Sequence, residues 1–170
     1  MPQSFTLIQS QNSVGSTPSS FVFSSIPQGY TDLYMEATLQ GVSASPQTVL
    51  QVGFSSGSGY IVQKLGASPN GSPGAGGNSG LPFLYQGNIN ASTGDSYAFC
   101  NWYIPVYSST VANKSYYGTA SGIWNSTPIY MNWIAGYSSQ TAAITSITIQ
   151  NEYGNWKANC TLNLYGITQA

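Results

Sequence analysis

Four carboxylates are the only acidic side chains in this sequence, at Asp32, Glu36, Asp95 and Glu152. A retaining glycosidase needs two carboxylates about 5 Å apart, and an inverting one needs roughly 6.5–9.5 Å. Asp32 and Glu36 fall on one face of an expected strand, where the strand rise separates them by about 13 Å. Their own spacing therefore argues against a catalytic pair, although either could meet Asp95 or Glu152 across space.

The other residue types used in catalysis are scarce. The chain has no His and no Arg, so it cannot build an ordinary Ser–His–Asp triad. Lys64, Lys114 and Lys157 lie in no nucleophile or phosphate-loop motif. Loop oxygens near Asp95 could bind Ca²⁺, but one carboxylate in residues 90–95 favours a turn stabilised by Asx-type hydrogen bonds. We expect no enzymatic activity, no cofactor and no metal site.

The charge content points to neutral contacts as the mode of action. Three Lys and four acidic residues in 170 give a net charge of −1, whereas roughly a quarter of an ordinary domain is charged. Such a chain has no field that would attract nucleic acid. No window approaches the roughly 18 apolar residues of a membrane helix, and residues 1–20 lack the pattern of a signal peptide.

Two cysteines, Cys100 and Cys160, lack the spacing of a metal site. Both fall on the inward-facing positions of expected strands. Three interpretations stay open: two small core residues, a disulfide across the core, or a reactive thiol.

Short alternating strands must position all of these residues. In residues 32–39, Leu33 and the apolar residues at every second position point one way and Asp32, Tyr34 and Glu36 point the other, which is typical of a half-buried strand. Turn-rich segments separate the runs. The sequence predicts one all-β domain over residues 1–170, an antiparallel two-sheet sandwich of jelly-roll type. About ten short strands are expected, near residues 5–8, 21–23, 33–39, 50–54, 60–65, 98–104, 116–123, 129–137, 145–149 and 160–164.

Residues 66–80 interrupt this rhythm. They are rich in Gly, Ser and Pro and contain no large apolar side chain, so we expect no core strand there. The segment is predicted to be a surface loop, with ordering against a neighbouring subunit as the alternative.

Aromatic residues are the remaining candidates for function: 13 Tyr, 4 Trp and 6 Phe. Trp102 and Trp133 match the inward-facing positions of their strands, and Trp156 is expected to plug a turn. Tyrosine combines apolar area with a hydroxyl, which suits interfaces and stacking on sugar rings. Several tyrosines do not follow the inward pattern: Tyr103, Tyr107, Tyr116, Tyr117 and Tyr130. The expected contact surface consists of Tyr116, Tyr117 and Trp124.

Three stretches together carry a family resemblance. They are residues 21–33 (FVFSSIPQGYTDL), residues 102–107 (WYIPVY), and residues 141–167, where TAAITSITI is followed by GNW and a closing LNLYGI. This set resembles small structural proteins in the virions of tailed bacteriophages, especially phages of aquatic bacteria and cyanobacteria. The resemblance spans roughly residues 5–167.

The resemblance implies a virion structural role without an enzymatic mechanism. We expect a homotrimeric decoration or cement protein that binds the major capsid protein of the assembled head. It would be made in the host cytoplasm and end on the particle exterior. The alternative is a tail or fibre module that recognises host glycan through Tyr116, Tyr117 and Trp124. A depolymerising enzyme is the third hypothesis, and the shortage of carboxylates and the missing His weigh against it.

Overall fold

Strands make up the regular structure throughout the described part of the chain. The computed structural model describes residues 4–42, 48–55, 60–67, 73–81, 84–89, 97–124, 127–152 and 154–169. None of these residues forms a helix that is long and apolar enough to cross a membrane. The strands are β1 Ser4–Asn12, β2 Ser20–Phe23, β3 Asp32–Leu39, β4 Thr48–Phe54, β5 Tyr60–Ala67, β6 Pro73–Leu81, β7 Leu84–Ile89, β8 Ala98–Ile104, β9 Lys114–Trp124, β10 Thr127–Ser138, β11 Ile147–Asn151 and β12 Thr161–Thr168.

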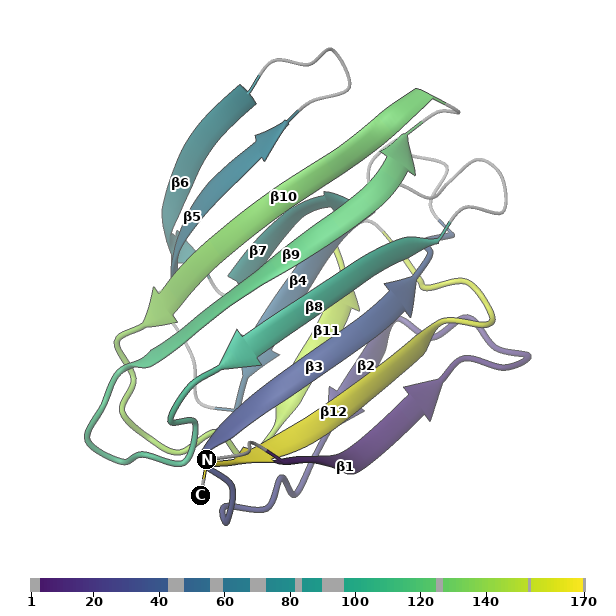
Figure 1. The fold of residues 1–170 in the computed structure, drawn as a ribbon. Coiled ribbons are helices and arrows are strands. Elements are labelled where there is room, and N and C mark those ends of the chain that lie inside the picture. Colours follow the sequence, from purple (N-terminus) through teal and green to yellow (C-terminus); the bar gives the residue numbers. More distant parts are fainter. Residues whose placement is uncertain are drawn as a thin grey trace.

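Two antiparallel sheets of unequal width lie face to face (Figure 1). The large sheet has eight strands in the order β1-β12-β3-β8-β9-β10-β5-β6, and the small sheet has the order β2-β11-β4-β7. The predicted two-sheet β-sandwich is confirmed.

The pairing is nested along the chain, as in a jelly roll. β1 pairs with β12, β2 with β11, β3 with β8, and β4 with β7. The first strand thus meets the last and each following strand meets one further in, which is how a long folded-over hairpin rolls into two Greek keys. The additional pairs β12–β3 and β11–β4 join these units within each sheet.

Two hairpins widen the large sheet beyond this eight-strand scheme. β9 and β10 lie between β8 and β11 in sequence, and β5 and β6 lie between β4 and β7. In space they form one extension, because β9 pairs with β8, β10 with β9, and β5 with β10. The extension broadens the outer face of the large sheet without adding strands to the small one (Figure 1).

The core fills the space between the sheets. Strand β3 shows why the strands form: Leu33, Met35, Ala37 and Leu39 are buried, and the intervening residues from Tyr34 onward are only partly covered. The small sheet faces them with alternating apolar residues of β2, β4 and β11. Each buried large apolar side chain contributes roughly 1.5–3 kcal/mol, so the alternation drives the sheets together.

All ten expected strands are present, and two further strands were missed. The surface-loop prediction for residues 66–80 is wrong for the part that the structure describes, because residues 73–81 form β6 and pair with β5. Strand β6 is one edge of the large sheet, and β1 is the other. Backbone hydrogen bonds alone can hold an edge strand, so the lack of large apolar side chains did not prevent pairing. Strand β7 was also missed.

Three aromatic positions differ from the sequence prediction. Trp133 is 55% exposed, so its predicted inward position is wrong; Asn132 and Ile134 on the same strand are buried instead. Tyr116 is buried at 2% exposure, where its ring packs edge-on against Phe54. Tyr107 is also buried.

Other aromatic predictions are confirmed or lie outside the description. Trp102 is buried as expected, and Trp156 plugs the core beside Phe21, with ring centroids 6.4 Å apart. The side chains of Trp124 and Tyr130 lie outside the described residues.

Both cysteines are buried and free. Of the three interpretations, the structure shows two small core residues and no disulfide between Cys100 and Cys160. Burial raises the pKa of the Cys100 thiol far above its usual range, which disfavours the reactive thiolate.

One lysine is entirely enclosed. The Lys114 ammonium donates to the carbonyl oxygens of Ser109, Ala112 and Thr141, at 2.5, 2.9 and 3.0 Å. All three of its hydrogens therefore find backbone acceptors. Burial lowers the pKa of the amine. The side chain ties the loop between β8 and β9 to the segment before β11.

Candidate functional site

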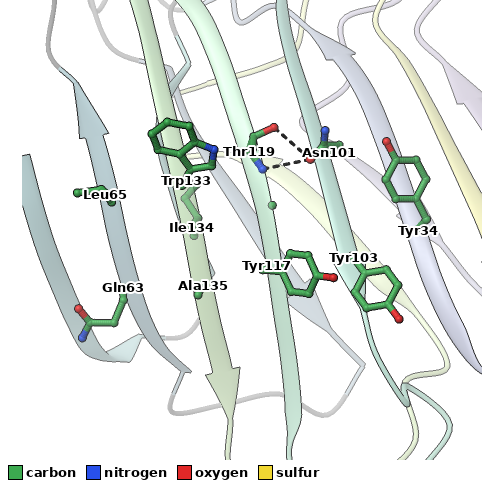
Figure 2. A pocket seen from close by; sticks show the side chains of 11 residues that line it. Tyr34, Gln63, Leu65, Asn101, Tyr103, Tyr117, Thr119, Trp133, Ile134 and Ala135 are labelled. Carbon is green, nitrogen blue, oxygen red and sulfur yellow. Dashed lines mark hydrogen bonds between the residues drawn. The ribbon is translucent and has the colours of Figure 1, made fainter. Parts of the chain in front are cut away.

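A groove of about 610 Å³ lies on the outer face of the large sheet, on the side away from the small sheet. Strands β3, β5, β8, β9 and β10 supply its walls (Figure 2). We call it the outer groove; its lining residues are Tyr34, Gln63, Leu65, Asn101, Tyr103, Tyr117, Gly118, Thr119, Trp133, Ile134 and Ala135. Tyr117, Trp133 and Leu65 are each more than half exposed, so large apolar groups face solvent here.

Four tyrosines from four adjacent strands form a row across this face. Tyr165 of β12 is registered with Tyr34 of β3, Tyr34 with Tyr103 of β8, and Tyr103 with Tyr117 of β9. The Tyr103 and Tyr117 rings are 5.0 Å apart between centroids, and Tyr34 and Tyr165 are 6.2 Å apart. Three strand spacings of about 4.8 Å make this tyrosine row about 14 Å long.

A polar row runs beside the tyrosine row, one pleat further along the strands. It consists of Asn163, Glu36, Asn101 and Thr119, which are registered across the same four strands. Trp133 of β10 and Leu65 of β5 continue it into the outer groove. The face thus offers aromatic surface and, in a parallel line, hydrogen-bonding groups that are neutral apart from the Glu36 carboxylate.

The amide of Asn101 is held in one orientation. Its Oδ1 accepts hydrogen bonds from the Thr119 backbone N–H at 3.2 Å and from the Thr119 hydroxyl at 3.1 Å (Figure 2). With Oδ1 engaged, the Nδ2 group is left as a donor for a ligand. Gln63, across the groove, is exposed and brings a second amide.

The groove floor requires a glycine at position 118. A Cβ there would lie 2.1 Å from the Asn101 carbonyl oxygen and 3.1 Å from the Trp102 ring. Because the nearest obstacle is backbone, a side chain at this position would push β8 and β9 apart. The close approach keeps Tyr103 and Tyr117 in contact.

Asp32 anchors Tyr103, an inner member of the tyrosine row. Its carboxylate is buried and accepts three hydrogen bonds, from the Tyr103 hydroxyl at 2.6 Å, the Val106 N–H at 2.8 Å and the Gln169 amide at 2.9 Å. Val106 has a φ of 42°, which is rare for a β-branched residue. The carboxylate therefore fixes both the Tyr103 ring and the chain reversal after β8.

Glu36 performs the same task for Tyr165, at the β12 end of the row. It accepts the Tyr165 hydroxyl at 2.9 Å and the Asn163 amide at 3.3 Å, both at Oε1. The hydrogen bond between Glu36 and the Tyr165 hydroxyl is the main cause that raises the pKa of Tyr165. The pKa of Tyr34 is raised mainly by burial and then by the charge of Glu36. Tyr34 and Tyr165 therefore hold their protons more tightly than free tyrosines while Glu36 lies beside them.

The Tyr103–Asp32 contact predicts a specific alkaline sensitivity. Burial, together with the hydrogen bond to Asp32 and its charge, raises the pKa of Tyr103 from 10.0 to about 12. The unfolded chain then releases this proton first, so the contact's stabilisation is complete below about pH 10 and is lost as pH rises through about 12. In urea unfolding, the wild-type advantage over Tyr103→Phe should shrink across this range. A constant difference between the two proteins would contradict the linkage.

The structure separates the three residues expected to form the contact surface. Tyr117 lies in the outer groove and is 56% exposed. The inclusion of Tyr116 is wrong, because adjacent residues of a strand face opposite sides and this one points into the core. The Trp124 side chain lies outside the described residues.

Sequence reasoning missed most of the groove. Tyr34, Tyr103 and Trp133 join Tyr117 there. The outward parity of Tyr34 in residues 32–39 was available as a signal. The alignment of these residues depends on strand order, which the sequence pattern does not give.

The acidic residues do not assemble a metal site in the described part of the chain. No group of three or more His, Cys, Asp or Glu side chains is close enough to hold an ion there. Glu152 is exposed after β11, and Asp95 lies outside the described residues.

No known family model matches this chain, and neither do curated proteins or solved structures. The functional argument therefore depends on the outer groove and the surrounding surface.

Proposed function

We propose that this protein is a non-enzymatic structural component of a tailed-phage virion, a decoration or cement protein that binds the assembled head. The resemblance in residues 21–33, 102–107 and 141–167 suggests the virion. The jelly roll supports it by analogy only, because both capsid and lectin domains use this architecture.

The edge strand β1 is the observation that carries an assembly role. It is one of the two edges of the large sheet, it is nine residues long, and it contains neither a charge nor a proline. Phe5 and Leu7 on this strand are 55% and 54% exposed. Monomeric proteins usually protect such an edge with charges or proline, because it is a template for another chain. We assign it to the contact between copies in a homotrimer, which then binds the major capsid protein.

Binding to the assembled head should stabilise the particle, because a protein that binds only one state favours that state by mass action. Particles that lack the protein should lose resistance to heat and osmotic shock, and adding the purified protein should restore it. The variant Phe5→Ser/Leu7→Ser should fail to restore resistance and should sediment as a monomer.

A matched control is available in two exposed loop residues. Val14→Ser/Val111→Ser removes apolar surface that is 72% and 86% exposed, in the turn after β1 and in the loop before β9, and should restore resistance like the wild type. Unchanged stability of particles without the protein would count against the cement role.

A second candidate function is a tail or fibre module that recognises host glycan. The exposed aromatic side chains of the outer groove favour it. Copy number separates the two: hundreds of copies per particle indicate a head decoration, and a few to tens indicate a tail or fibre.

A further inference from the structure

We infer that the outer groove binds an uncharged polysaccharide chain and discriminates against anionic ones. The inference rests on a binding role for the groove, which a head-mounted or a tail-mounted protein would share. Four properties of the groove lead to it: aromatic faces, neutral amides, uncompensated carboxylates and an extended shape.

The exposed aromatic side chains favour a ligand with flat apolar surfaces. Tyr117 and Trp133 are 56% and 55% exposed on adjacent strands, and Figure 2 shows both rings lying over the strands together with Tyr103. The C–H face of a sugar ring presents such a surface, and aromatic side chains with a polar tip suit a ligand that is half apolar and half wet. Nucleobases would also stack here.

Charge decides between these ligands. No Lys or Arg is found among the lining residues that the structure describes, whereas single-stranded nucleic acids are held by cationic grooves. Lys114 is buried, and its ammonium donates hydrogen bonds to three backbone carbonyls, so it does not face a ligand in the groove. A hydroxyl-rich neutral chain needs no cation, and the amides of Asn101 and Gln63 provide donors and acceptors for it.

Two carboxylates add selectivity against acidic sugars. Glu36 lies in the polar row next to Asn101, and Asp32 accepts the hydrogen bond of the Tyr103 hydroxyl. Their hydrogen bonds come from neutral donors: Tyr103, Val106 and Gln169 for Asp32, and Asn163 and Tyr165 for Glu36. A uronic acid or sulfate bound along the row would meet negative charge, and none of the described lining residues is a cation that could offset it.

The shape of the site favours a chain over a single sugar. The tyrosine row crosses four strands, about 14 Å by strand spacing, and the groove continues past Trp133 to Leu65 of β5. One monosaccharide would leave most of this surface uncovered. Affinity should therefore increase with the number of sugar units.

The test uses the purified protein and titration calorimetry. Cellohexaose, mannohexaose and xylohexaose, together with their disaccharides, are the neutral probes; an alginate hexamer and a heparin hexasaccharide are the anionic ones. At least one neutral hexamer should bind with a millimolar or lower Kd, more tightly than its disaccharide, and its Kd should not change with salt. Each anionic hexamer should bind at least about tenfold more weakly than this neutral hexamer, a difference in binding free energy of about 1.4 kcal/mol.

Variants connect binding to the groove. The substitutions Tyr117→Ala and Trp133→Ala should each raise the Kd for the neutral hexamer by about tenfold or more, as expected for aromatic residues at the centre of a contact. Tyr97→Ala, an exposed aromatic residue outside the groove, should bind like the wild type. Glu36→Gln should reduce the difference in Kd between the neutral and the anionic hexamers.

Several outcomes would overturn the inference: no binding of any neutral hexamer, equal binding of an anionic one, or unchanged binding by Tyr117→Ala and Trp133→Ala. These results are independent of the head assay. Loss of particle stabilisation by Phe5→Ser/Leu7→Ser tests the proposed virion role without any sugar present.

Discussion

Replacing Asp32 with alanine should lower the free energy of unfolding by about 3 kcal/mol, because buried donors would lose a charged acceptor. The Tyr103 hydroxyl and the Val106 N–H both depend on this carboxylate. Val106 is already in the left-handed region at φ 42°, so removing its partner also releases a strained turn. Urea unfolding gives the free energy directly, and the melting temperature should fall by roughly 6–12 °C.

A second carboxylate provides the control. Glu152 is exposed after β11, and Glu152→Ala should stay within about 0.5 kcal/mol of the wild type. Asp32→Asn keeps one acceptor oxygen, so its free energy of unfolding should lie between those of Asp32→Ala and Glu152→Ala. If Asp32→Ala is as stable as Glu152→Ala, the carboxylate does not anchor the turn after β8.

Replacing Lys114 with methionine should lower the free energy of unfolding by about 3 kcal/mol, because methionine keeps the length of the side chain but supplies no hydrogen-bond donors. The carbonyls of Ser109, Ala112 and Thr141 would then be left without the ammonium that joins them. Hydrogen exchange should increase in residues 105–113 together with 139–146, since the lysine connects these two segments. Urea unfolding measures the overall loss.

The same loop contains a suitable control for this variant. Val111 is 86% exposed, so Val111→Ala should change the free energy of unfolding by less than about 0.5 kcal/mol. If Lys114→Met were as stable as the wild type, the cost of burying the ammonium would equal the gain from its three hydrogen bonds.

Binding at the outer groove would benefit from many copies. A millimolar affinity is weak for one domain, but linked sites raise the effective concentration of the next contact. A head decoration present in hundreds of copies would therefore hold a polysaccharide surface through many weak contacts.

Alternation in the sequence was sufficient to predict most strands. Residues 98–104 carry apolar, buried side chains at every second position, and β8 has the predicted bounds. Strand β6 was missed because its nine residues are mostly Gly, Ser and Asn. Its place in the sheet comes from backbone pairing with β5, which leaves no signature in side-chain hydrophobicity.

The site was harder to predict than the fold, for a physical reason. Tyr116 and Tyr117 are neighbours with the same side chain, and only the register of β9 with β8 decides which one faces the core. Trp133 is a large apolar residue on the outer face, so reading hydrophobicity as burial places it on the wrong side. Both errors arise where the outer face of the sheet is itself apolar.

The nested pairing also constrains how the chain can fold during synthesis. Strand β3 has β12 on one side and β8 on the other, and β1 pairs only with β12. The large sheet therefore stays open beside β3 until the last strand has left the ribosome. Such long-range closure is slow, and the unpaired edges meanwhile can pair with other nascent chains. A protein with so little charge to repel its neighbours should depend strongly on the rate at which its C-terminal strand arrives.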